Sequence, residues 1–293
     1  MVTVRVPASS ANLGTGFDTL GLAWQLYFTV KARPAKPFSD FRVSSAGDLI
    51  TRSMQVVFEQ AGINMPALEL QTESDIPVGK GLGSSAAVII AGMYLANHLC
   101  GTPFCEAQLL NWALAIEGHA DNITAAASGG LTTVMVLGKN VYYHKVPVHQ
   151  GLKAVIVVPD FVLPTREARA VLPREVSWQD CVQHTQQACF VLQSLANGDY
   201  RHLAVAMDDA IVQEVRQPLI PGLAQVLQAA RANGALGTCL SGAGPSVLAL
   251  AKEGNLTAIG KAMQEAFAAK NIKSCCLYTT IDHDGVRIEE YDV

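Results

Sequence analysis

The sequence predicts a mixed α+β fold with two domains, residues 1–150 and 151–293. Segments with strand patterns and segments with helical spacing follow one another along the whole chain. The pattern changes near Gln150, where 152–158 is a continuous apolar run. With 293 residues, 50% of them hydrophobic, the chain is long enough to bury a sizeable core. No repeat, low-complexity segment or long linker interrupts it.

In the first half, alternation and β-branched or aromatic residues predict strands at 3–6, 22–32, 67–72, 131–137 and 141–144. Helical spacing, ended by a glycine, predicts helices at 50–61, 84–100 and 104–117. The second of these is apolar nearly all round, which is typical of a buried helix.

In the second half, the apolar run 152–158 predicts a buried strand. Helices are expected at 178–196, 200–216, 223–232 and 258–269. Segment 238–251 is strand-like but interrupted by glycines, and strands at 274–281 and 286–291 end the chain.

Composition argues against several classes of protein. A net charge of −4 disfavours a nucleic-acid binder, which usually carries a basic surplus. The seven cysteines form no C-x-x-C pair, which favours free thiols in a reducing compartment. The N-terminus lacks the apolar segment of a signal peptide, and the best apolar run, 86–99, is too short to span a bilayer. We therefore expect a soluble, cytoplasmic protein.

The stretch IPVGKGLGSSAA (76–87) suggests a phosphate site. It is not a P-loop, because Lys80 is followed by Gly81 and no glycine lies five positions before Gly79. It is not a dinucleotide-binding G-x-G-x-x-G motif either. Glycines nevertheless let main-chain N–H groups approach an anion, and Ser84-Ser85 begins a helix whose N-terminus attracts phosphate. The alternative is a tight turn in which Ser84 caps the helix.

Two further loops have the same character. PASSANLGTGFD (7–18) follows a strand and ends in an acid, and GTCLSGAGPSVLAL (237–250) places three glycines around Ser241. Three such segments, early, middle and late in the chain, predict one composite ligand site.

Together these motifs resemble the GHMP small-molecule kinases. The family's phosphate loop P-x-x-x-G-L-G-S-S-A is matched in full by 77–86. The resemblance extends to the homoserine kinases of that family, through 7–18, EGHADN (117–122), TREARAVLP (165–173) and Arg216 before Pro221-Gly222. The one departure is Ala120, where the family usually has proline.

The resemblance implies a ribosomal-S5-type N-terminal domain with a left-handed βαβ crossover, a ferredoxin-like C-terminal domain, and ATP between them. It implies ATP-dependent phosphorylation of the L-homoserine side-chain hydroxyl, in threonine biosynthesis. The alternatives are another GHMP kinase with a different hydroxylated substrate and a non-catalytic binding protein on the same fold. The resemblance also suggests a homodimer, while the charge and the short apolar runs argue against a nucleic-acid or membrane partner.

The resemblance places ATP on the central loop, with the main-chain N–H groups binding its phosphates. The residues concerned are Pro77, Val78, Gly79, Lys80, Gly81, Leu82, Gly83, Ser84, Ser85 and Ala86. Ser85 and Glu117 would bind Mg²⁺ through oxygen, the ligand type it prefers. A carboxylate is unfavourable at a helix C-terminus, which supports a functional role for Glu117. For Lys80, a phosphate contact and a solvated side chain are equally open.

For homoserine, Arg169 and Arg216 suit the carboxylate, because a planar guanidinium can bind it through two bonds. Nearby Arg166 is expected to face solvent. The ammonium and hydroxyl are expected at Asn12, Asp18, His119 and Asn122, with Gly242 from the last loop. Taken singly, Asn12 is also typical of a turn, Asp18 of a cap and His119 of a satisfied turn histidine.

The resemblance assigns direct catalytic roles to Glu117, Asn122 and Asp18. It implies no dedicated general base. Asp121 lies nearby, but a hydroxyl that attacks a loose, metaphosphate-like centre needs little early deprotonation.

Overall fold

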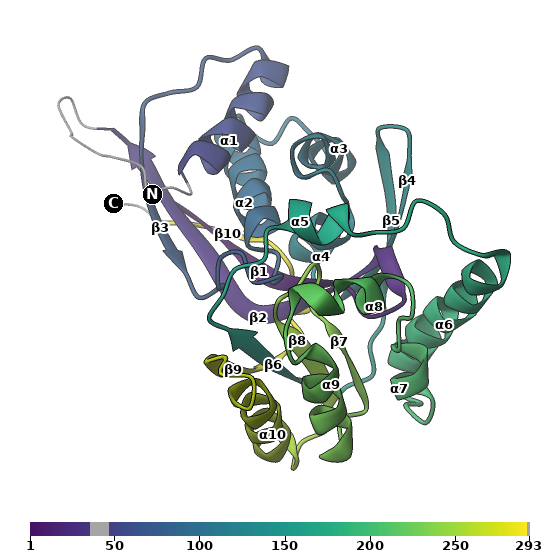
Figure 1. Cartoon of the computed structure of the whole chain (residues 1–293). Helices are drawn as coiled ribbons and strands as arrows, with labels where there is room; N and C mark the ends of the chain where they lie inside the picture. Colours follow the sequence, from purple (N-terminus) through teal and green to yellow (C-terminus); the bar gives the residue numbers. More distant parts are fainter. Residues whose placement is uncertain (36–46, 292–293) are drawn as a thin grey trace.

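The computed structural model describes residues 1–35 and 47–291, and in this part of the chain the strands form two antiparallel sheets (Figure 1). The first sheet has the order β10-β1-β2-β4-β5, with β3 pairing β2 beside this path. Its strands are β1 (Val2–Asn12), β2 (Gly16–Pro34), β3 (Leu68–Ser74), β4 (Leu131–Leu137), β5 (Asn140–Val146) and β10 (Arg287–Glu290).

The second sheet has the order β7-β8-β6-β9, and each pair is antiparallel. Its strands are β6 (Lys153–Pro159), β7 (Gly237–Leu240), β8 (Val247–Ala251) and β9 (Ser274–Thr280). Helices separate β6 from β7 and β8 from β9, so the succession is β-α-β-β-α-β. This is the ferredoxin-like arrangement expected for the second half.

The helices lie between these strands along the chain. In the first half, α1 (Gly47–Ala61) connects β2 to β3, and α2 (Ser84–Leu99), α3 (Glu106–Glu117) and α4 (Asp121–Ser128) connect β3 to β4. Between β6 and β7 lie α5 (Thr165–Ala170), α6 (Trp178–Asn197), α7 (Leu203–Ala206), α8 (Val212–Arg216), the 3₁₀ turn η1 (Gln217–Leu219) and α9 (Leu223–Ala232). Finally, α10 (Leu256–Ala268) connects β8 to β9.

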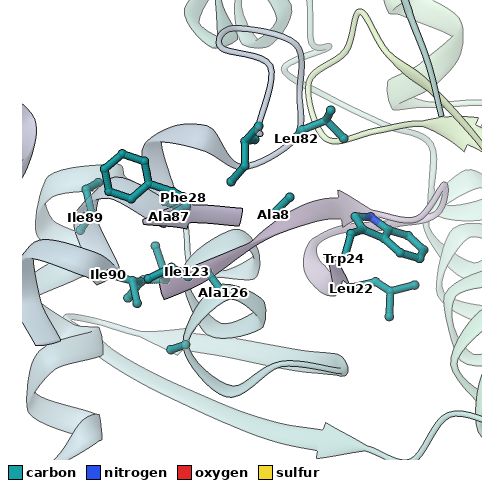
Figure 2. Packing of buried hydrophobic residues seen from close by; sticks show 14 of the residues in the cluster. Ala8, Leu22, Trp24, Phe28, Leu82, Ala87, Ile89, Ile90, Ile123 and Ala126 are labelled. Atoms are coloured by element: carbon teal, nitrogen blue, oxygen red, sulfur yellow. The ribbon is translucent and has the colours of Figure 1, made fainter. Parts of the chain in front are cut away.

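The central helix α2 packs into the core of the first half, as its apolar composition predicts. Ile90 of α2 lies beside Ile123 of α4 (Figure 2), and both belong to one core with Ala87 of α2, Ala8 of β1 and Leu22 of β2. Because α2 is held in the core, its first turn and the glycine-rich loop before it have a fixed position.

The strand β6 owes its uniform apolar sequence to burial on both faces. Ala154 and Ile156 belong to the core that includes the first sheet. Val155 and Val157 belong to a second core with residues of α9 and α10, which cover the other face (Figure 1). A strand with two buried faces loses the alternation seen in half-exposed strands.

The single helix expected over 200–216 is wrong. The chain forms α7 and α8 instead, because the Asp209 carboxylate accepts hydrogen bonds from the N–H groups of Ile211, Val212 and Gln213. Such a side chain competes with helix continuation and starts a new turn. The helices α4 and α5 had no sequence prediction, since small residues give α4 no clear apolar period.

The chain passes from the first sheet to the second between β5 and β6, and β10 returns to pair with β1. The end of the chain thus rejoins the first sheet, and the division at residue 150 stays a prediction. Residues 36–46 and 292–293 lie outside the described part.

Both β3 and β4 run antiparallel to β2, so they are parallel to each other across α2, α3 and α4. The expected left hand of this crossover also stays a prediction.

Within residues 1–35 and 47–291, no helix has both the length and the apolar character that a membrane crossing requires.

Candidate active site

The early and central glycine-rich loops lie against each other. The Ser9 N–H donates to the Leu82 carbonyl at 3.1 Å. The Ser9 hydroxyl donates to the Asn122 side-chain oxygen at 2.8 Å, which joins both loops to the start of α4.

The late loop closes on the other two. The Ser241 hydroxyl donates to the Gly81 carbonyl at 2.6 Å and lies 2.6 Å from the Ser10 hydroxyl. The Gly242 N–H donates to the Ala11 carbonyl at 3.2 Å. The three segments predicted to share one site are therefore in contact.

A cavity of about 120 Å³ lies where the loops meet. It is lined by Ala11, Asn12, Phe17, Gly79, Gly81, Leu82, Gly83, Ser84, Ser85, Glu117, His119, Asp121, Asn122, Leu163, Pro164, Thr165, Arg169, Arg216, Gly242 and Ala243. Residues from both halves of the chain form its wall.

The central loop depends on glycine for both conformation and space. Gly81 and Gly83 have φ angles of 75° and 67°, in the left-handed region. A Cβ atom on Gly81 would lie 2.1 Å from the Ser241 carbonyl oxygen, and one on Gly83 would lie 2.1 Å from the Ser9 hydroxyl. No other residue allows the loops to approach this closely.

We expect Gly81→Ala to raise the KM for ATP, the ligand that the resemblance places on this loop, at least about tenfold, because the new Cβ must push the central loop away from Ser241. The matched control is Gly101→Ala. Gly101 also has a left-handed φ, of 82°, but a Cβ atom added there would have no described atom within 4 Å beyond its chain neighbours. Both variants should lose about 1–2 kcal/mol of stability from the left-handed φ. Steady-state kinetics and thermal unfolding measure the two effects. An equal change in KM for both variants would contradict the role of the close contact.

The start of α2 faces the cavity without a side-chain cap. Gly83 is the N-cap, with no capping hydrogen bond, so the interpretation of Ser84 as the N-cap is wrong. Ser84 and Ser85, in the first turn, line the cavity. The first N–H groups of a helix have no intrahelical partner, and with the helix dipole they favour an anion. The 16-residue α2 therefore presents to the cavity an end suited to an anion.

Two oxygen-bearing side chains, Ser85 and Glu117, lie at this helix end. The Ser85 hydroxyl donates to Glu117 Oε1 at 2.6 Å. The Glu117 side chain, only 9% exposed, lies at the C-terminal end of α3, where the helix dipole disfavours a carboxylate. In the described part of the chain, no cluster of three His, Cys, Asp or Glu side chains could hold a metal ion. A hard cation here would need further oxygens from a ligand or water.

His119 lies between two carboxylates. Its Nδ1 is 3.1 Å from Asp121 Oδ1, and its Nε2 is 3.8 Å from Glu117 Oε1. Burial lowers the pKa of His119, but the hydrogen bond and charge of Asp121, then the charge of Glu117, leave it raised overall. Asp121 also accepts from the Asn122 N–H at 2.7 Å, so its carboxylate is already engaged.

The wall of the cavity also carries the two predicted arginines. Arg169 donates to both oxygens of Asp18, at 3.1 and 2.5 Å, across the two halves of the chain. Arg216 is 2% exposed, and it donates to the carbonyls of Ala168 at 3.0 Å and Gly242 at 3.1 Å. Burial, then the charge of Arg169, lowers the pKa of Arg216 to about 10, so it stays cationic at neutral pH.

Asn12 supports this wall from the early loop. Its amide donates to the Gly242 carbonyl at 3.0 Å and its oxygen accepts from the Asp18 N–H at 3.0 Å. Asn12 and Asp18 both have left-handed φ angles, of 71° and 52°. Asn12 therefore links the early loop to the late loop and orients the residue that pairs with Arg169.

Two family models match the chain: the GHMP kinases N terminal domain at residues 48–130 and the GHMP kinases C terminal domain at residues 191–269. A homoserine kinase from Halothermothrix orenii is 38% identical over 301 aligned residues, which cover 98% of this chain and 96% of that protein. The chain belongs to the homoserine kinase family, a branch of the GHMP kinases.

Further homoserine kinases are similar to this chain over nearly its whole length. A homoserine kinase from Clostridium beijerinckii is 37% identical, with 99% of both chains covered. The crystal structure of homoserine kinase from Cytophaga hutchinsonii superposes with a TM-score of 0.86 at 30% identity, over 98% of this chain and 97% of that one. The two-domain GHMP kinase fold predicted from the sequence is confirmed.

Most residues predicted for the site of this homoserine kinase family member line the cavity. The exceptions come from the central loop and from Asp18, which reaches the site through Arg169. Val78 is 76% exposed, Ala86 is buried in α2, and Lys80 donates to main-chain carbonyls of the second half. Pro77 is also absent from the lining.

The structure adds contacts that the sequence did not reveal. Ser9, Ser10 and Ser241 bond the three loops together, and the only signal for Ser9 and Ser10 was the hydroxyl content of their loop. The Phe17 ring lies 5.2 Å from the Arg169 guanidinium and 5.7 Å from that of Arg216. An aromatic face at this distance stabilises two cations that would otherwise repel each other.

Proposed function

We propose that this protein transfers the γ-phosphoryl group of ATP to the side-chain hydroxyl of L-homoserine, giving O-phospho-L-homoserine and ADP. One observation carries the proposal: a single cavity joins an uncapped helix start to two guanidinium groups, one of which is paired with the Asp18 carboxylate. The first suits phosphate, and the others suit an amino acid zwitterion. The names of the relatives support this substrate.

ATP would place its phosphates on the central loop and at the start of α2. The Ser85 hydroxyl and the Glu117 carboxylate would hold Mg²⁺, since the two groups are already in contact and carry the oxygen ligands that a hard cation prefers. The remaining ligands would be phosphate oxygens and water. Bound Mg²⁺ supplies charge neutralisation during phosphoryl transfer.

Homoserine would place its carboxylate at Arg169 and Arg216 and its ammonium at Asp18. In the ligand-free protein, Asp18 and Arg169 satisfy each other. A zwitterion can take over both halves of this pair, because it carries the matching charges. A substrate with only one charge would leave a partner unmatched, at a cost of several kcal/mol if buried.

The substrate hydroxyl would lie near Asn122 and His119, on the side of the cavity that faces Glu117. The nearest candidate for a dedicated base is already engaged, because Asp121 is 1% exposed and bonded to His119 and to the Asn122 N–H. Alignment of the hydroxyl and charge neutralisation would then supply most of the catalysis.

A coupled assay of ADP release, with ATP and one candidate acceptor at a time, tests the function. We expect ADP release with homoserine to exceed that with mevalonate, galactose or threonine at least about 100-fold. Phosphorus NMR should show one new phosphomonoester. Faster turnover of another acceptor would favour a different GHMP kinase activity. Binding of ATP and homoserine without turnover would indicate a non-catalytic member.

A cytoplasmic location and a homodimer accompany this proposal as expectations from the family. Light scattering of the purified protein would give the oligomeric state directly.

A further inference from the structure

Lys80 lies inside the phosphate loop, but its side chain points away from the cavity. Its ammonium Nζ donates to the Pro159 carbonyl at 2.8 Å and to the Phe161 carbonyl at 2.6 Å. Lys80 is absent from the residues that line the cavity. The sequence leaves a phosphate contact and a solvated side chain equally open for Lys80, and the ammonium instead binds the main chain at and just after the end of β6.

The rest of the loop is also bonded to the second half of the chain. The Lys80 carbonyl accepts from the Ser246 N–H at 3.3 Å, and the Gly81 carbonyl accepts from the Ser241 hydroxyl at 2.6 Å. These bonds hold the loop to the segment between β7 and β8. The two bonds from the Lys80 ammonium reach a different segment, the one after β6.

That segment leads directly to the substrate side of the cavity. It continues from Phe161 into Leu163, Pro164 and Thr165, which line the cavity, and then into α5. Arg169 lies on α5 and pairs with Asp18. A shift at Pro159 or Phe161 is therefore passed along a short stretch of chain to the guanidinium that faces Asp18.

On its other side, the start of this segment is held by β9. Pro159 pairs with Ser274 of β9, and the Asp160 N–H donates to the Lys273 carbonyl at 2.9 Å, whereas Val162 is 59% exposed. Hydrogen bonds from a charged donor are about twice as strong as neutral ones. The Lys80 ammonium is thus a principal attachment of this segment to the phosphate loop.

We propose that Lys80 is a positioning residue that couples the ATP phosphate loop to the segment bearing Arg169. This link fixes the ATP part of the site relative to the homoserine part. The inference rests on the proposed function for the identity of the two ligands. Because such coupling is reciprocal, loss of the link affects binding of both substrates.

Two other roles for Lys80 make different predictions. A direct phosphate contact would affect ATP and leave homoserine binding unchanged. A merely solvated lysine would affect neither substrate.

The first experiment compares KM values in three variants. Lys80→Met keeps the length of the side chain and removes the charge and the donors; we expect it to raise both KM values about tenfold, with kcat within about threefold of the original. Lys80→Arg retains donors for both carbonyls and should recover most of the loss. Lys139→Met, in the exposed turn between β4 and β5, is the control and should match the original protein. A rise confined to the ATP KM, or no change in either, overturns the proposal.

The second experiment needs no turnover. Amide hydrogen exchange of the ligand-free protein should be faster in Lys80→Met than in Lys139→Met over 160–168, because that segment has lost its attachment. Unchanged exchange there overturns the proposal, whether or not homoserine is the substrate. If homoserine is not phosphorylated but exchange rises as expected, the proposed function fails and the link stands. If Lys80→Met does not fold, Lys80→Gln, which keeps one amide donor group, takes its place in both measurements.

Discussion

Glu117→Ala is expected to lower kcat about 10³-fold, whereas Asp121→Asn should keep at least about a tenth of the kcat of the original protein. Glu117 supplies the carboxylate bonded to Ser85, at the position proposed for Mg²⁺. Alanine leaves a single protein oxygen for the cation, and the barrier for phosphoryl transfer should rise by about 4 kcal/mol. Steady-state kinetics across a range of Mg²⁺ concentrations measures the change.

Asparagine at position 121 preserves the acceptor that the structure uses. Its side-chain oxygen can still accept from the Asn122 N–H and from His119, which are the partners of the Asp121 carboxylate. A general base would lose its function completely in this variant. Equal losses for Glu117→Ala and Asp121→Asn, in proteins with the same circular dichroism, would show that Asp121 acts as a base.

The sequence predicts that three glycine-rich loops form one site, and the structure shows these loops in contact. Glycines at 79, 81 and 83 before Ser84-Ser85 favour an anion site, with a tight turn as the alternative. The structure shows that these glycines allow the loops to approach each other closely, and that Gly83 and not Ser84 is the N-cap. The helix start was therefore predicted correctly, and the alternative in which Ser84 caps the helix is excluded.

Contacts between segments distant in the chain could not be predicted from the sequence. Asn12 and Arg216 share the Gly242 carbonyl as an acceptor, which no spacing in the sequence reveals. The direction of the Lys80 side chain depends on carbonyls nearly eighty residues away. Main-chain acceptors carry no side-chain signature, so a sequence gives no indication of which donor will reach them.

The break between α7 and α8 illustrates a local failure. The apolar spacing over 200–216 supports one helix, but Asp209 offers its carboxylate to three N–H groups and begins a second. A side chain that competes with the helix outweighs a favourable spacing. This turn matters for the site, because it sets the position of Arg216 at the end of α8.

Arg169→Ala is expected to raise the KM for homoserine about 100-fold while the KM for ATP changes less than about threefold. Removing one guanidinium leaves the substrate carboxylate with Arg216 alone, and it leaves Asp18 without its partner in the free protein. Loss of a charge-assisted pair in a partly buried site costs about 3 kcal/mol, which corresponds to the expected factor. The initial rate, measured with each substrate varied in turn, separates the two constants.

Arg166→Ala is the matched control, since Arg166 lies on the same short helix, α5, but is exposed and does not line the cavity. It should leave both KM values within about twofold, as surface substitutions usually do. The contrast between the two arginines depends on position and not on charge, because each variant removes one positive charge. A defect of Arg169→Ala confined to ATP, or an equal defect in Arg166→Ala, would place the homoserine carboxylate elsewhere. If homoserine amide, which lacks the carboxylate, is used equally poorly by the original protein and by Arg169→Ala, the guanidinium acts on that carboxylate.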